Sequence, residues 1–251
     1  MTVAAGPALR SWRQRRNLSQ LELAHRAGVS SRHVSFIETG RARPTSEMIL
    51  RLCEQLAVPL REQNRILLAG GHAPAHPEHS LQQPAMAEVA AAIDSLLTGQ
   101  LPYPALVIDA GWDLVAANDA VYRLLAGAAP GLVEPPVNVL RLTLHPDGLA
   151  PRIANLAEWR AHLLARLRRE HDATGDPRLA ELLAEFGPVR ADRSSAPGLI
   201  VPLKLATPAG ELSLLSTTTV FGTALEVTLS ELTIETFYPA DAATRALLLG
   251  G

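Results

Sequence analysis

The sequence predicts an α+β protein, with an all-α N-terminal domain followed by a domain in which helices pack on an antiparallel sheet. Three observations predict this class. Five short helical patterns, separated by turn residues, fill the first seventy residues. Two apolar runs flank a turn signal near residue 110, and strand-like sequence dominates residues 199–237. Helical periodicity fills the interval between these two groups of strands, so the helices of the second domain are grouped together.

Length and composition place the chain among globular proteins. It has 251 residues, 47% of them hydrophobic and 19% charged, which is enough to bury a core in one or two domains. No apolar run approaches the roughly 18 residues of a membrane span, and the N-terminus becomes basic where an export signal is apolar. Cys53 is the single cysteine, so no internal disulfide forms. These features predict a cytoplasmic protein without membrane association.

The charges divide unevenly along the chain. Residues 1–72 contain 11 Arg and 5 Glu with no Lys or Asp, a net charge of +6, whereas residues 73–251 carry 12 basic and 20 acidic residues, a net charge of −8. This asymmetry indicates that the first part alone meets a polyanion. Composition drift between two domains is the alternative that charge by itself leaves open.

Local signals delimit the N-terminal helices. Ser19 and Glu22 form a capping box, and Gly28 supplies the left-handed residue that ends the helix they start. Because Ala27-Gly28-Val29 joins this helix to the next, the pair has the form of a helix-turn-helix. In order, the predicted helices are Ala8–Arg16, a helix from the Ser19 cap to Gly28, a helix from the Ser30 cap to Gly40, a helix opened by Pro44-Thr45, and Leu60–Ala69.

The outward face of the third helix is unusual for a surface that meets only water. Opposite the inward Val34 and Ile37, and along the adjoining flank, lie Arg32, Ser35, Phe36, Thr39 and Ser31. In a DNA major groove, arginine forks onto guanine and phenylalanine contacts a thymine methyl group. The alternative for Phe36 is sideways packing on a neighbouring helix.

These residues belong to a larger pattern. Leu18-Ser19-Gln20, Gly28-Val29-Ser30 and Phe36-Ile37-Glu38-Thr39-Gly40-Arg41-Ala42-Arg43-Pro44 keep the residue types and spacing of a known family. Over about residues 7–70 the chain resembles the phage-repressor-like (XRE) helix-turn-helix family. Phe36 departs from the polar residue that many phage repressors carry there, which leaves the operator sequence open.

The resemblance implies a role for each matching position. Gln20 holds a phosphate at a helix N-terminus, Arg41 and Arg43 lie against the phosphates, and Arg13 forms a buried structural ion pair with Glu38. The full DNA-binding set expected from the sequence is Gln20, Ser30, Ser31, Arg32, Ser35, Phe36, Thr39, Arg41 and Arg43.

A proline- and histidine-rich segment, residues 73–84, follows and shows no apolar period. His72, His76 and His79 have no spacing that closes a metal site with a fourth ligand, so we interpret the segment as a linker and expect no metal.

The second domain reads as helix, hairpin, helices and strands. A helix from Pro84 ends at Gly99, and the runs 105–108 and 114–117 flank Asp109-Ala110-Gly111 as a hairpin. Asp176-Pro177 caps a later helix. The predicted tail strands are Leu199–Leu205, Glu211–Val220 and Ala224–Phe237, with a phase slip at Ser230-Glu231 that predicts a bulge or a break.

Several separated motifs of this domain keep the order of a second family. They are Tyr103-Pro104-Ala105-Leu106-Val107, Trp112-Asp113-Leu114-Val115-Ala116-Ala117-Asn118, His145-Pro146-Asp147-Gly148, residues 221–229 and Phe237-Tyr238-Pro239-Ala240-Asp241. Over about residues 84–248 the chain resembles the MmyB-like ligand-binding domain of actinobacterial regulators. The resemblance implies a PAS-like fold with a pocket for an apolar or fatty-acid-like molecule. Glu226 stands where the family usually has Asp.

Candidate ligand residues follow from this interpretation. Arg141 and His145 are candidates for a polar head group, with Arg141 the partner of a carboxylate. The candidates for the lining are Trp159, Leu163, Leu167, Val220, Phe221 and Leu225, although Trp159 and Phe221 are also ordinary core residue types. No nucleotide, hydrolase or zinc-protease motif occurs, and His145 near Asp147 reads first as a turn, so no catalytic residue is expected.

The sequence therefore predicts a cytoplasmic, ligand-responsive transcription regulator that acts as a homodimeric repressor on a duplex operator. We expect residues 1–72 to bind DNA, 73–84 to link, and 85–251 to bind ligand and dimerise, with no cofactor. Two alternatives remain at this point: a second domain that only dimerises or binds a protein, and an enzyme fused to a DNA-binding autoregulator.

Overall fold

A computed structural model describes residues 4–187 and 200–250, which form two compact units. The first unit contains the described residues up to His79 together with Thr223–Ser230, and the second contains those of Ser80–Gly222 and Glu231–Gly251. Each unit has its own buried apolar cluster. The segment 223–230, although late in the chain, is thus part of the N-terminal unit.

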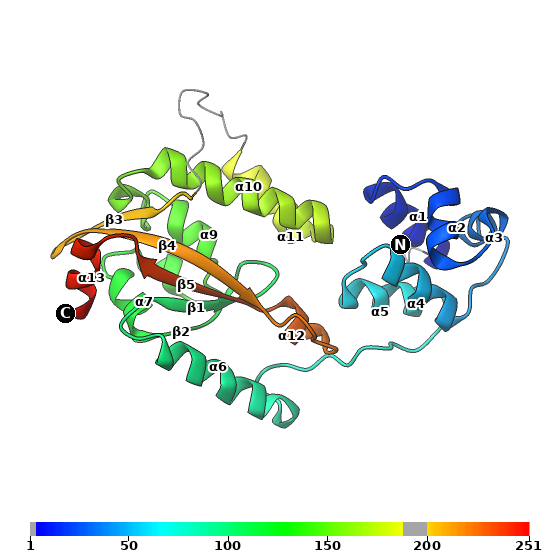
Figure 1. Ribbon diagram of the computed structural model, residues 1–251, viewed down its shortest axis with the longest axis horizontal. Helices are drawn as coiled ribbons and strands as arrows, with labels where there is room; N and C mark the ends of the chain where they lie inside the picture. Colours follow the sequence, from blue (N-terminus) through cyan, green and yellow to red (C-terminus); the bar gives the residue numbers. More distant parts are fainter. Residues whose placement is uncertain (1–3, 188–199, 251) are drawn as a thin grey trace. The chain divides into compact units, whose positions relative to one another are not determined.

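The five predicted N-terminal helices are confirmed. They are α1 (Ala5–Arg15), α2 (Gln20–Ala27), α3 (Ser31–Glu38), α4 (Ser46–Gln55) and α5 (Leu60–Ala69), all labelled in Figure 1. Ser19 and Glu22 form both hydrogen bonds of the capping box at the start of α2, and Gly28 ends that helix with φ of 66°. The side chain of Ser30 caps α3, and that of Thr45 caps α4.

Helix α1 begins at Ala5, earlier than predicted, and its first turn approaches α3 closely. A Cβ atom on Gly6 would lie 2.2 Å from the carbonyl oxygen of Ile37, so only glycine permits this contact. Pro7 is tolerated because it lies in the first turn, where the amide has no helical partner. Gly and Pro, which normally interrupt helices, are here part of one.

Cys53 lies on α4 within the core of the N-terminal unit. Its exposed fraction is 0%, and apolar neighbours such as Ile49 and Leu52 share the same cluster. Burial raises the pKa of the Cys53 thiol to about 12, so the group stays protonated at neutral pH.

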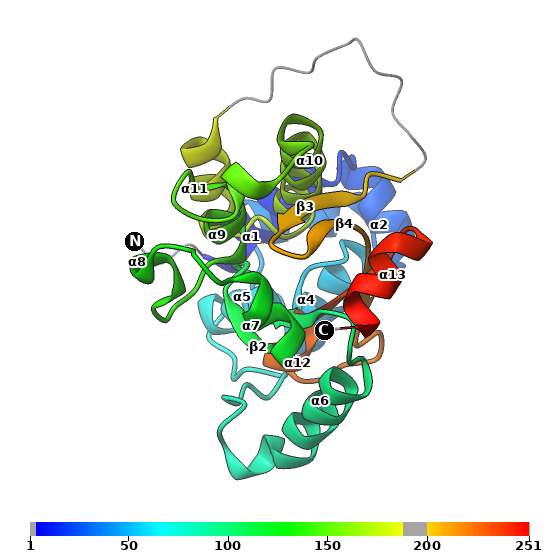
Figure 2. The ribbon, with the colours of Figure 1, turned by 90° about the vertical axis from the view of Figure 1, so that its left-hand side faces the viewer.

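The second unit is built on five strands. These are β1 (Ala105–Ile108), β2 (Leu114–Ala117), β3 (Leu203–Thr207), β4 (Gly210–Val220) and β5 (Thr233–Pro239). The remaining helical elements of the chain are η1 (Pro84–Met86), α6 (Ala87–Gly99), α7 (Asp119–Leu124), α8 (Pro130–Val133), α9 (Val139–Leu144), η2 (Ala150–Arg152), α10 (Leu156–Thr174), α11 (Pro177–Phe186), α12 (Val227–Glu231) and α13 (Ala242–Leu249). Figures 1 and 2 both place the sheet between α10 above and α6 below.

The strands form one sheet in the order β2-β1-β5-β4-β3, and every neighbouring pair is antiparallel. The α+β class with an antiparallel sheet is therefore confirmed. Asn118 ties the sheet to its surroundings: its side chain accepts from the amide of Ala105 at 3.2 Å and donates to the carbonyl oxygen of Leu97 at 3.1 Å. It also caps α7, so one buried amide joins α6, β1 and α7.

The predicted strand Ala224–Phe237 is wrong in its first half, where the chain forms α12 before β5 begins. The Glu226 carboxylate accepts from the amide of Leu229 at 2.6 Å, which starts a helical turn where alternating apolar residues predicted a strand. Leu225 is exposed while Val227 is fully buried. The phase slip at Ser230-Glu231 marks this change from helix to strand. Leu199, the first residue of another predicted strand, lies outside the described residues.

Candidate functional site

Helices α2 and α3, joined through Gly28, form a helix-turn-helix whose second helix presents a polar face. Val34 and Ile37 point into the core, each 1% exposed. The predicted base-reading residues are all exposed or half-exposed on the other side: Ser31, Arg32, Ser35, Phe36 and Thr39, with Ser30 at the N-cap. The face that meets solvent is the one predicted to enter a groove.

Arg32 and Phe36 form a unit on this face. The guanidinium carbon of Arg32 lies 5.1 Å from the centre of the Phe36 ring, one turn along the helix. Phe36 therefore contacts Arg32 on the same face of the helix. A guanidinium that already rests on an aromatic ring loses less conformational entropy when it forms hydrogen bonds with a base.

A buried ion pair fixes α3 against α1, as the resemblance implied. Arg13 donates to both carboxylate oxygens of Glu38, at 2.6 and 2.8 Å. Gln20, at the start of α2, adds a third hydrogen bond to Glu38 at 2.8 Å. Burial acts to raise the pKa of Glu38, but the hydrogen bonds from Arg13 and Gln20 outweigh it and hold that pKa below its usual value. The Gln20 amide nitrogen is thus engaged inside the protein.

Arg41 and Arg43 lie exposed on the loop between α3 and α4. The turn is tied to the end of α3, because the amides of Arg41 and Ala42 both donate to the carbonyl oxygen of Phe36. This loop places two cations next to the polar face of α3, where a DNA backbone would pass.

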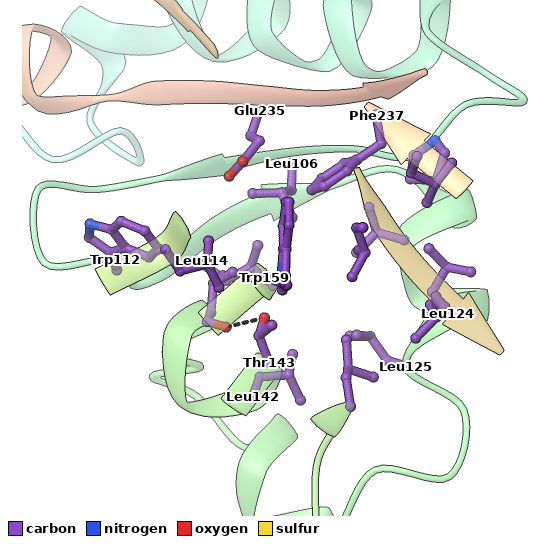
Figure 3. A pocket seen from close by; sticks show the side chains of 18 residues that line it. Leu106, Trp112, Leu114, Leu124, Leu125, Leu142, Thr143, Trp159, Glu235 and Phe237 are labelled. Carbon is purple, nitrogen blue, oxygen red and sulfur yellow. Dashed lines mark hydrogen bonds between the residues drawn. The ribbon is translucent and has the colours of Figure 1, made fainter. Parts of the chain in front are cut away.

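The second unit encloses an apolar cavity between its sheet and helices. The cavity has a free volume of about 70 Å³ and receives side chains from all five strands and from α7, α9 and α10. Figure 3 shows Leu106, Leu124, Leu125, Trp159 and Phe237 converging on this space. The volume is below the roughly 150 Å³ that holds a benzene molecule in an engineered cavity, so the walls are nearly in contact.

Besides the indole of Trp112, three polar side-chain groups interrupt the apolar lining. Thr143 donates its hydroxyl to the carbonyl oxygen of Val139 at 2.7 Å, the dashed line in Figure 3. The indole Nε1 of Trp159 is buried and has no hydrogen-bond partner among the described residues. Glu235, on β5, is the charged residue of the lining and is 4% exposed.

A network behind the cavity holds the Glu235 carboxylate. Arg166 of α10 donates to Glu235 at 3.1 Å and to Glu170 at 2.8 Å, and its guanidinium lies 4.7 Å from the centre of the Trp112 ring. Trp112 in turn donates its indole N–H to Glu170 at 2.6 Å. Burial raises the pKa of Glu235 above its usual value, although the neighbouring Arg166 opposes this shift.

The structure brings only two of the predicted ligand residues to the cavity. Trp159 and Leu163 line it, whereas Leu167 is buried in the same core without reaching the lining. Arg141, the expected carboxylate partner, is exposed and forms an ion pair with Glu185 at 2.8 Å. The others do not reach the cavity either, because His145 is half-exposed beside Asp147, Phe221 is half-exposed, and Val220 and Leu225 are exposed.

Sequence reasoning missed Glu235 and Arg166, although a signal was present. Arg166 follows Leu163 by three residues and thus falls on the inward stripe of α10 that Trp159 and Leu163 define. A cation on a buried stripe requires an acidic partner, and Glu235 lies on β5 two residues before Phe237, so both side chains fall on the same face of the sheet.

The linker predicted from the sequence is held firmly against α5. Asn64 is 7% exposed; its side-chain oxygen accepts from the amides of Ala75 and His76 at 3.0 Å, and its nitrogen donates to the carbonyl oxygen of His76 at 2.8 Å. The His76 ring also hydrogen-bonds the side chain of Gln63. Residues 75–76 are thus an ordered part of the N-terminal unit.

The end of the same segment contacts the connection between β4 and β5. Glu226 accepts from the amide of His79 at 2.7 Å, and the amide of Val227 donates to the carbonyl oxygen of Pro77 at 2.9 Å. We call the Asn64 and Glu226 contacts with residues 75–79 the linker clasp. Through the linker clasp, the segment between the cavity-lining strands β4 and β5 is hydrogen-bonded to residues that α5 holds in the N-terminal unit.

No described helix has the length and apolar character to cross the bilayer. Within residues 4–187 and 200–250, no group of three His, Cys, Asp or Glu side chains is placed to hold a metal ion. His72, His76 and His79 instead make separate polar contacts, the first with the carbonyl oxygen of Pro44.

Comparison with known families agrees with this geometry. Residues 9–63 match the helix-turn-helix family, and residues 89–249, more than half of the chain, match the MmyB-like transcription regulator ligand binding domain. No curated protein matches the chain significantly. Both resemblances noted in the sequence are thereby confirmed. The chain therefore belongs to the MmyB-like transcription regulators and is a DNA-binding regulator that joins a helix-turn-helix to a ligand-binding domain.

Proposed function

We propose that the protein is a cytoplasmic, homodimeric repressor whose operator affinity changes when an apolar molecule, with a fatty-acid-like chain, occupies the cavity of its C-terminal domain. The predicted domain boundaries of 1–72, 73–84 and 85–251 and the PAS-like interpretation of the sheet are part of this proposal. Two subunits would read half-sites about 34 Å apart or a multiple of that distance.

The observation that carries the proposal is the linker clasp. Strands β4 and β5 contribute Leu214, Glu235 and Phe237 to the cavity. The segment between these strands holds residues 77–79 through Glu226 and Val227. A ligand larger than the free volume displaces strand side chains, and that displacement reaches residues 77–79 through the β4–β5 connection and the hydrogen bonds of Glu226 and Val227.

The base-reading role assigned to α3 is supported by its exposed Arg32 and Phe36 and by the loop arginines. Gln20, Ser30, Ser31, Ser35 and Thr39 complete the proposed contact set. Because the net charge of residues 1–72 is +6, phosphate contacts supply most of the sequence-independent affinity.

The test measures operator binding by the full chain, before and after addition of a medium-chain apolar probe, with fluorescence anisotropy on DNA selected from a random pool. We expect the probe to raise the melting temperature and to change operator affinity. Glu226→Ala removes the acceptor for the His79 amide, and it should keep ligand-free DNA binding while abolishing the response to the probe. Glu211→Ala, at an exposed acid on β4, is the matched control.

A second candidate function has a specific observation in its favour. The cavity is nearly closed at about 70 Å³, which suits a domain that only dimerises or binds a protein. If no probe shifts the melting temperature and the operator affinity stays constant, this alternative replaces ligand regulation.

A further inference from the structure

The indole of Trp159 carries a hydrogen-bond donor that no residue in the described part of the chain satisfies. The side chain projects from α10 into the middle of the cavity lining, as Figure 3 shows, and the residue is 2% exposed. Its Nε1 has no partner among the described residues. Buried donors almost always find an acceptor, and an unpaired one destabilises the folded state. A bound ligand that carries an acceptor oxygen would satisfy this N–H, which no described residue does.

The lining of the cavity also contains a carboxylic acid, that of Glu235. Glu235 lies on the cavity wall, and its counter-ion Arg166 is already bonded to both Glu235 and Glu170. The described lining contains no arginine, lysine or histidine. A ligand carboxylate placed here would lose its water beside a like charge without gaining a cation. Arg141, which would have supplied one, points its charge to Glu185 at the surface.

We infer that the cavity takes an uncharged amphiphile, an apolar chain with an ester, ketone or similar oxygen that accepts the Trp159 indole N–H, in preference to a free carboxylate. This inference rests on the proposed ligand-regulated function and names the chemistry of its ligand. The ligand oxygen accepts from the Trp159 indole N–H, which has no other partner in the described structure, and the apolar chain replaces contacts among the leucines of the wall.

The free volume sets how such a molecule enters. A free volume of about 70 Å³ admits a head group but not a chain of nine carbons. The apolar chain of the ligand must therefore push apart the side chains that form the wall. Leu124 and Leu125 are only partly buried and lie at the end of α7, opposite Phe237 in Figure 3. Leu124 and Leu125 can therefore move aside without disturbing the packing of α10 in the core.

Two isomeric probes isolate the head group. Methyl octanoate and nonanoate have the same carbon and oxygen counts, but only the second is charged near neutral pH. Non-1-ene adds an apolar probe without an oxygen. Binding to the full chain is measured by titration calorimetry at about pH 8. We expect methyl octanoate to bind at least about tenfold more tightly than nonanoate, since the acceptor is shared and the charge is not.

Trp159→Phe removes the donor and keeps an apolar ring. We expect this substitution to lower the affinity for methyl octanoate by about five- to tenfold and to leave the affinity for non-1-ene nearly unchanged. Trp12→Phe, the same substitution in the N-terminal core, is the matched control. In the unaltered protein, the ¹⁵N-indole spectrum provides an independent measurement, because the Trp159 N–H resonance should move downfield with the ester and not with the alkene. That spectrum remains informative if Trp159→Phe does not fold.

Equal affinity for the two isomers, or an equal loss of ester and alkene binding in Trp159→Phe, would overturn the inference. So would an indole resonance that the ester leaves in place. These outcomes are distinct from failure of the proposed function, which is shown when none of the three probes alters operator affinity. Tight nonanoate binding that changes operator affinity would keep the function and remove the uncharged head group.

Discussion

Arg32 stacks its guanidinium on the ring of Phe36 at 5.1 Å, and both side chains stand on the face of α3 that points away from the core. The pair explains why a large aromatic residue occupies an outward position. The ring limits the conformations of the arginine before any DNA is bound, so less entropy is lost on binding.

Substitutions in this pair should separate base reading from general affinity. Arg32→Ala is expected to weaken operator binding by roughly 1–3 kcal/mol and to relax the preference at one base pair. Phe36→Leu should have a smaller effect on the same base pair, because it frees the arginine without removing it. Arg51→Ala, on α4 in an exposed pair with Glu47, is the control. Selection from randomised DNA measures all three, and an unchanged base preference in Arg32→Ala would reject the assignment.

The loop arginine Arg43 should hold phosphate without reading sequence. Arg43→Ala is expected to weaken binding to operator and to random DNA alike, and to reduce the slope of log affinity against log salt by about 0.9. Anisotropy titrations across a series of salt concentrations test this. A substitution effect confined to one operator sequence would contradict it.

The Arg13–Glu38 pair should dominate the acid sensitivity of the N-terminal unit. The folded-state pKa of Glu38 is below its usual value, so its contribution to stability is complete above the ordinary glutamate pKa of about 4.3 and is lost as the pH falls through the lower folded-state pKa. Glu38→Gln, which leaves Arg13 buried without its charge partner, should cost about 3–5 kcal/mol at neutral pH.

Glu47→Gln supplies the comparison for that prediction, because the Glu47–Arg51 pair is exposed and should contribute at most about 1 kcal/mol. Urea unfolding followed at several pH values measures both variants. Equal stabilities for the two variants at neutral pH would refute the role given to the buried pair.

Arg141 should make no contribution to ligand affinity. Its partner Glu185 is exposed, so Arg141→Ala is expected to change the free energy of unfolding by no more than about 1 kcal/mol and to leave probe affinity unaltered. Thermal unfolding and calorimetry with methyl octanoate check both statements. A clear loss of probe affinity would bring the arginine back into the ligand site.

Local signals allowed much of the fold to be predicted. The Ser19–Glu22 box, Gly28 and Asp176 act on neighbouring residues only, so their helices begin or end where the sequence indicates. Helix α12 depends in addition on contacts with residues 77–79, far away in the chain, and a periodicity argument does not contain them.

The candidate functional site also has one part that the sequence could predict and one that it could not. The α3 face could be predicted because helical geometry alone decides which residues oppose Val34 and Ile37. The cavity could not, because its lining combines five strands whose register the sequence does not specify. Sequence reasoning favours Arg141 as the partner of a ligand carboxylate, but the fold pairs it with Glu185 at the surface. Glu235 is identified only once β5 is paired with its neighbours and Arg166 is placed beside it.

The burial of Cys53 has a practical consequence for studying the regulator. Its thiol is inaccessible and remains protonated at neutral pH, so maleimide reagents should leave the native protein unlabelled. A cysteine introduced at an exposed position such as Glu54 would then be the one group that takes a spin label or a dye. Distances between two such labels would report how far apart the DNA-reading helices of a dimer stand, with and without a ligand, in a chain that needs no other change.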